Sequence, residues 1–256
     1  MFILLVLLLC FCCFECFFIQ KSSIKSRNII PTRFALSATS SSECLDHINT
    51  IKTNSDISAI MDAIIKLEKE QKEKKIDLNS LKFTKWKLIF STDDNTRSSP
   101  FFWAFTKALN DNNLIKDKLK LNSKNIYEFT DNIPLKNIGD AIQSFEEIEG
   151  NNILKSQVQI NVDFVGSSLM TTTSKWIPIE EENIIELRVI KTQVLESTIA
   201  KFLPFLDSNM SFPSGNALEL VTPGSSTVYL KVTVLNENIR IVRTAEKVFV
   251  FERICK

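Results

Sequence analysis

Histidine is nearly missing from this chain, since His47 is the single one among 256 residues. A nucleophilic serine or cysteine needs a base beside it, usually histidine, and zinc sites are built from clusters of cysteine and histidine. His47 lies near the start of the expected folded region, away from most of the chain. We therefore assign no catalytic residue, no metal ligand and no cofactor, and we expect the protein not to be an enzyme.

Glycine is also scarce, and the five glycines stand apart from one another. A phosphate-binding loop needs several glycines at fixed spacing, so neither a dinucleotide-binding nor a P-loop motif can be built. Carboxylates do cluster at Glu146-Glu147 and at residues 180–182. Acidic runs at the ends of strands are more typical of solvated surface than of acid–base chemistry. These absences favour a binding or structural protein.

The cysteine pattern and the charge balance exclude two further classes. Four of the six cysteines lie in residues 10–16, and the two in the body, Cys44 and Cys255, cannot form a disulfide framework. The chain carries 31 basic and 30 acidic residues. Such a balance lacks the basic surface of a nucleic-acid-binding protein, so no nucleic-acid partner is expected.

The first 42 residues have the composition of a targeting sequence. Residues 1–16 are apolar over the length of a signal-peptide core, which is short for a membrane span of about 20 residues. Residues 17–42 hold four basic residues, seven serines and no acid, which is typical of a transit peptide. Together they predict a bipartite presequence and hence a location in a secondary plastid. The alternative is a signal anchor followed by a basic tail.

Residues 43–80 are predicted to form an N-terminal helical region. Apolar residues recur at spacings of three and four between Ile57 and Leu67, which places them on one face of an amphipathic helix spanning residues 55–75. Ser55 is the expected N-cap, and Asp56 the acidic residue of the first turn.

Residues 81–256 are predicted to form one β-domain. Apolar and polar residues alternate with a period of two, which indicates strands with one buried face. Seven or more antiparallel strands favour a closed barrel, so the predicted fold class is mainly β: a lipocalin-like antiparallel β-barrel with an N-terminal amphipathic helix. A proline- and glycine-containing stretch at residues 202–224 is expected to be a long loop. The segments with this alternation are residues 86–90, 157–164, 171–176, 186–190, 227–234, 239–242 and 248–251, with residues 138–149 as a further candidate.

Three segments resemble the plastid-lipid-associated (fibrillin) family: LKFTKWKLIFST at residues 81–92, RSSPFFWAF at 97–105, and YLKVTVLNENIRIVRTAEKVFVFER at 229–253. The sequence departs from the family pattern at Thr84, where a glycine is usual, and at Phe90, where a tyrosine is usual. Thr244 and Ala245 replace the Gly-Asp of the closing turn.

The resemblance implies a lipocalin-like barrel that binds or stores hydrophobic small molecules such as carotenoids, quinones and other prenyl lipids. Its expected places are plastoglobules (plastid lipid droplets) or thylakoids. One alternative is a non-catalytic partner that stabilises a prenyl-lipid biosynthetic enzyme. Another is an enzyme on the same scaffold, which would need polar side chains inside the barrel, with Glu186, Arg188 and Lys231 as the residues to inspect.

Two groups of site residues follow. By analogy with lipocalins, Trp86 on the first strand is expected to lie under Arg240 or Arg243 and to close one end of the barrel. A cation–π contact of this kind stabilises by about 0.5–2 kcal/mol, and the arginines are expected to be structural rather than anion-binding. An aromatic cluster is expected either to plug the barrel or to form an exposed lid or membrane-docking patch. The cluster consists of Phe101, Phe102, Trp103 and Phe105.

Overall fold

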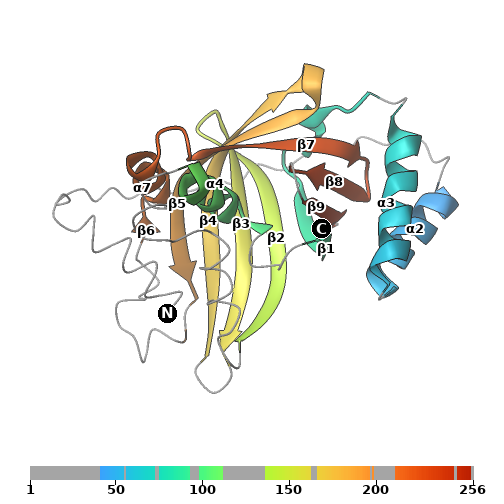
Figure 1. Ribbon diagram of the computed structural model, residues 1–256, viewed down its shortest axis with the longest axis horizontal. Helices are drawn as coiled ribbons and strands as arrows, with labels where there is room; N and C mark the ends of the chain where they lie inside the picture. The colour runs from blue at the N-terminus through green and yellow to red at the C-terminus, as the bar shows by residue number, and fades with distance from the viewer. Residues whose placement is uncertain are drawn as a thin grey trace.

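The computed structural model describes residues 41–54, 56–72, 75–92, 98–111, 136–162, 166–196, 198, 211–244 and 247–254 (Figure 1). The predicted targeting segment, up to residue 40, lies outside these residues. So do the polar stretch after Asp111 and the body cysteine Cys255.

The sheet is a closed barrel of eight antiparallel strands, which confirms the predicted fold class. Its order is β4-β3-β2-β1-β9-β8-β7-β5, and β4 pairs back with β5 to close the ring. A ninth short strand, β6, pairs with the far end of β5. The strands are β1 (Lys85–Ser91), β2 (Lys136–Ile148), β3 (Asn151–Val162), β4 (Gly166–Ile179), β5 (Ile184–Leu195), β6 (Ser211–Phe212), β7 (Thr227–Leu235), β8 (Ile239–Arg243) and β9 (Val248–Arg253).

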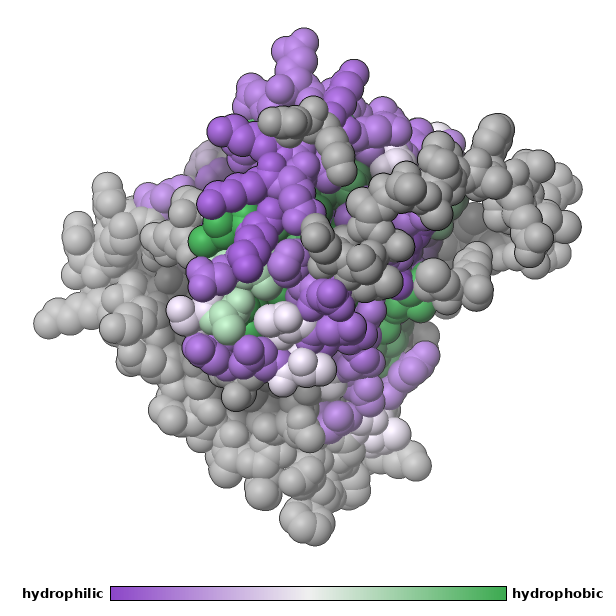
Figure 2. Space-filling model, turned by 90° about the vertical axis from the view of Figure 1, so that its right-hand side faces the viewer, coloured by the Kyte–Doolittle hydropathy of each residue, from purple (hydrophilic) through white to green (hydrophobic). Residues whose placement is uncertain are grey.

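Two helices, α2 (Ser41–Thr53) and α3 (Ile57–Gln71), pack against the outside of β7, β8 and β9 (Figure 1). The apolar face predicted for residues 57–67 buries Ile60, Ile64 and Leu67 there. Strands β8 and β9 are therefore buried on both faces, and β9 is apolar on both. Figure 2 looks onto this side of the molecule and shows a mostly hydrophilic outer surface, with apolar residues visible only between the polar ones.

The N-terminal helical region differs from the prediction at its start. Helix α3 begins at Ile57 with Asp56 as its N-cap, whose carboxylate accepts a 2.9 Å hydrogen bond from the backbone N–H of Ser58. An aspartate oxygen at the N-cap satisfies one of the free N–H groups of the first turn and suits the helix dipole. The expected cap Ser55 lies outside the described residues. Most of α2 lies within the predicted helical region, although only the helix at residues 55–75 was specified there.

Short helical segments stand at the two ends of the barrel. The 3₁₀ helix η1 (Leu78–Leu81) lies at the end where β1 begins, and Glu180 of η3 (Glu180–Glu182) accepts hydrogen bonds from its Leu78 N–H (3.4 Å) and Asn79 amide (2.9 Å). Helices α4 (Pro100–Asp111) and α7 (Ser214–Val221) pack together against β5 at the other end (Figure 1). The prediction of a loop throughout residues 202–224 was therefore wrong for β6 and α7.

No helix in the described ranges combines the length and the apolar character needed to cross a bilayer.

Candidate functional site

Trp86 closes the η1 end of the barrel. Its side chain is 1% exposed, and its Nε1 donates a 2.7 Å hydrogen bond to the hydroxyl of Thr84. The guanidinium carbon of Arg240 lies 5.3 Å from the centre of the Trp86 ring, 4.8 Å from that of Phe145 and 4.3 Å from that of Phe251. Three aromatic rings from three strands thus surround one arginine inside the barrel.

Arg243 does not take part in this closure, contrary to its inclusion in the predicted pair. Its side chain lies on the outer face of β8 and donates two hydrogen bonds to Glu68 of α3, at 2.7 and 2.9 Å. Hydrogen bonding to Glu68 raises the pKa of Arg243. Residues 240 and 243 are an odd number of positions apart on one strand, so their side chains point to opposite faces. Arg243 links α3 to the outside of the barrel, and Arg240 lies in the barrel interior.

The charge of Arg240 is buried without a counter-ion among the described residues. Its Nη2 donates to Oε1 of Gln143 at 2.5 Å, and its Nε has no acceptor in that part of the chain. Burial lowers the pKa of Arg240 to about 9, so the side chain is still a cation at neutral pH. No carboxylate of the described residues pairs with it. Removing an ion from water costs several kcal/mol, which the rings and one amide offset only in part.

Polar residues continue from Gln143 as a row across the inner wall. Gln143 on β2 is directly opposite Ser156 on β3, and Ser156 is directly opposite Thr172 on β4. All three are buried. Alternation of apolar and polar residues does not reveal these positions, because it marks only the apolar ones as buried. A sign of the row in the sequence is a polar residue that alternates in step with buried apolar ones, as Gln143 does between Ala141 and Phe145.

Four more buried polar atoms have no partner in the described part of the chain: the hydroxyls of Ser99 and Ser174 and the indole Nε1 atoms of Trp103 and Trp176. Ser174 and Trp176 share the inner face of β4, and the Trp176 ring contacts Phe145 edge to face at 5.4 Å. Indole and guanidinium N–H groups can only donate, and each unsatisfied buried group costs about 1–3 kcal/mol. The interior therefore has an excess of donors.

The aromatic cluster of α4 is a plug rather than an exposed patch. Phe101, Phe102, Trp103 and Phe105 are each at most 8% exposed and belong to the same core cluster as the inner residues of the barrel. The Trp103 ring lies 5.1 Å from that of Phe249 on the inner face of β9. The alternative of an exposed membrane-docking surface is therefore wrong in this structure. Helix α4 covers the barrel interior from the end opposite Trp86.

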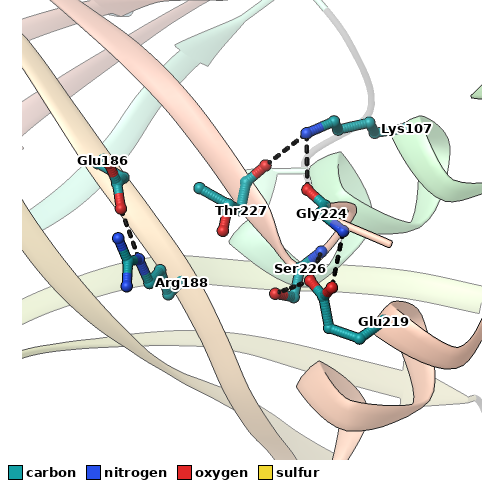
Figure 3. A network of polar contacts seen from close by, with 7 residues as sticks. All are labelled: Lys107, Glu186, Arg188, Glu219, Gly224, Ser226 and Thr227. Atoms are coloured by element: carbon teal, nitrogen blue, oxygen red, sulfur yellow. Dashed lines mark hydrogen bonds and ion pairs between the residues drawn. The ribbon is translucent and has the colours of Figure 1, made fainter. Parts of the chain in front are cut away.

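Hydrogen bonds fix α4 to the segment that joins α7 and β7 (Figure 3). Lys107 donates to the carbonyl oxygens of Gly224 at 2.8 Å and Thr227 at 3.1 Å. The carboxylate of Glu219 accepts from the backbone N–H groups of Gly224 (2.7 Å) and Ser226 (3.0 Å), and from the Ser226 hydroxyl. The bond from the Ser226 hydroxyl is the main reason why the pKa of Glu219 is lowered.

We expect the Glu219 contacts to make stability depend on pH. Because folding lowers its pKa below the usual 4.5, the ionised carboxylate stabilises the fold above that pH, and the contribution is lost as the pH falls through the folded pKa. Urea unfolding at neutral and acidic pH should show wild type more stable than Glu219→Gln at neutral pH, with the difference shrinking in acid. The exposed Glu181→Gln is the control, and a difference that grew in acid would contradict the assignment.

The three residues proposed for an enzymatic interior do not point inward. Glu186 and Arg188 form an ion pair on the outer face of β5, at 2.5 Å between Oε1 and Nε (Figure 3). Lys231 on β7 is exposed. The inward neighbours Leu187 and Val189 are buried and apolar. In the described residues there is also no group of three or more His, Cys, Asp or Glu side chains that could hold a metal ion.

Comparisons with family models, with curated proteins and with solved structures each gave no match to this chain.

Proposed function

We propose that the protein holds a hydrophobic small molecule inside the barrel and acts as a plastid lipid-associated protein. Carotenoids, quinones and other prenyl lipids are the candidate cargo, and plastoglobules or thylakoids are the candidate place. The composition of residues 1–42 supports the plastid location. The fibrillin-like segments at residues 81–92, 97–105 and 229–253 support the lipid class.

The observation that carries the proposal is the group of unpartnered donors in the barrel interior. Barrels of eight strands can hold one small ligand, as lipocalins do. Binding pockets for small molecules are mostly apolar with a few polar groups that fix orientation. Here Arg240 Nε, Trp103 Nε1 and Trp176 Nε1 are buried donors without acceptors among the described residues. A ligand with an apolar body and acceptor oxygens would satisfy them.

Native lipid extraction followed by mass spectrometry tests the proposal. The full chain is expressed together with plastid lipids, purified without detergent exchange and extracted with organic solvent. We expect one lipid class in stoichiometric amount. An unrelated β-barrel protein, purified from the same cells, measures the lipid background. A folded protein that carries no lipid above that background would contradict the proposal and would favour a role as a partner of a biosynthetic enzyme.

A further inference from the structure

We propose that Arg240 binds the carboxylate of an apolar acid held in the barrel. This inference rests on the proposed function. It narrows the ligand class from hydrophobic small molecules in general to those that end in an acid group. It also gives Arg240 a ligand-binding role where the sequence analysis expected a structural one.

The first argument is charge. Arg240 is 1% exposed, and its hydrogen bond within the described residues goes to the neutral amide of Gln143. The outer arginine, Arg243, has the carboxylate of Glu68 as its partner. Buried charges in proteins are normally paired, and in the described residues the partner of Arg240 is missing. A carboxylate from a ligand would supply the missing charge.

The second argument is geometry. Trp86, Phe145 and Phe251 lie within 5.3 Å of the guanidinium carbon, measured to their ring centres, so they supply its apolar surroundings. The Nε–H is left without an acceptor in the part of the chain that the structure describes. Arginine binds carboxylates through two parallel N–H bonds along one edge of its plane. The free Nε–H offers one of these bonds, and Nη2, which carries two hydrogens, can offer the second while still bound to Gln143.

The third argument is the apolar surroundings of Arg240 on the side of α4. Phe251 contacts the guanidinium, Phe249 is the next inward residue on β9, and its ring contacts Trp103 of α4. Gln143 accepts from Arg240 through Oε1, and its Nε2 donates to the carbonyl oxygen of Ser98, just before α4, at 3.4 Å. The groups around the guanidinium are thus apolar rings and one amide, which suits an acid with an apolar body, and Gln143 is a positioning residue that orients the guanidinium.

Fluorescence titration with cis-parinaric acid and its methyl ester tests the inference on the full chain. These probes share one 18-carbon polyene and differ only in the charge of the head group. We expect wild type to bind the acid at least about ten-fold more tightly than the ester, which corresponds to about 1.4 kcal/mol. Arg240→Met should abolish this preference, because the acid loses its charged partner and then binds no more tightly than the ester. Arg243→Met, which removes the outer arginine, should keep the preference.

The outcomes separate this inference from the proposed function. Equal binding of acid and ester by wild type would overturn the role of Arg240 and leave the proposed function standing. Failure to bind either probe would count against both. If Arg240→Met does not fold, Arg240→Lys provides the second variant and should retain the preference. Attraction of the acid to surface lysines would disappear at about 0.5 M salt, so a preference lost at that salt concentration would also overturn the inference.

Discussion

Replacing Trp86 with alanine is expected to abolish the cooperative unfolding transition of this protein. The side chain is fully enclosed, and removing a buried tryptophan costs about 3–5 kcal/mol. The contact with Arg240 adds about 0.5–2 kcal/mol. A whole domain is stable by only about 5–15 kcal/mol. Denaturant unfolding followed by far-UV circular dichroism should show a clear sigmoidal transition for wild type and none for Trp86→Ala.

Trp86→Phe is the matched control for this prediction. Phenylalanine keeps a ring beneath the guanidinium and loses the 2.7 Å bond to Thr84, which is worth about 1 kcal/mol. It should therefore fold, with a slightly lower midpoint. A soluble Trp86→Ala protein that unfolds cooperatively near the wild-type midpoint would show that the ring cluster does not close the barrel.

Replacing Gly215 with alanine is expected to displace α7 from the barrel. A Cβ atom at this position would lie 2.0 Å from the carbonyl oxygen of Val189 and 2.9 Å from its carbonyl carbon. Both are backbone atoms of β5, so the helix has to move. Overpacking typically costs about 1–3 kcal/mol, and we expect a loss of about 3 kcal/mol because Leu218 also leaves the core. Urea unfolding of wild type and variant measures the difference.

Asn216→Ala tests the same helix without the steric clash. Asn216 is the next residue of α7 and is exposed, so its replacement should change stability by no more than about 0.5 kcal/mol. Equal stabilities of Gly215→Ala and Asn216→Ala would mean that α7 does not dock as closely on β5 as the structure has it.

Most strands of the barrel could be predicted from the sequence, because the alternation of apolar and polar residues within a single strand is enough to identify it. Val228, Leu230 and Val232 alternate with polar residues, and all three face the interior of β7. The apolar residues on both faces of β9 also indicate how the barrel is covered. Val248 and Val250 contact the outer helices, whereas Phe249 and Phe251 face inward. A strand that is apolar on both faces has a second layer covering it.

Helix α7 could not be predicted from its composition, because Pro213, Gly215 and Pro223 are residue types that are also typical of loops. Pro213 is in fact the N-cap residue, just before the helix, where proline is tolerated because its missing N–H has no helical partner. Gly215 serves close packing, and Pro223 follows the end of the helix. The residues of this segment are compatible with either a loop or a short helix, and packing against β5 favours the helix.

The interior polar site could not be found by searching for reactive side chains. Gln143, Ser156 and Thr172 have no unusual chemistry alone, and they belong together only because strand register places them opposite one another. For Arg240, sequence analogy gave two candidates on one strand. Their odd spacing places them on opposite faces of the strand. Which face is the inner one was not evident from the sequence, because β8 also buries apolar residues against the outer helices.

The pairing of β1 with β9 sets a limit on when this protein can finish folding. These strands stand near opposite ends of the described chain, and the ring is open until they meet. Contacts between distant segments form late because a long loop must first be closed. The outer helices α2 and α3 can pack only after these C-terminal strands have formed, since they dock on β7, β8 and β9. A chain still emerging from a ribosome, or still threading through a narrow pore, therefore lacks its last strand and stays unfolded until that strand arrives.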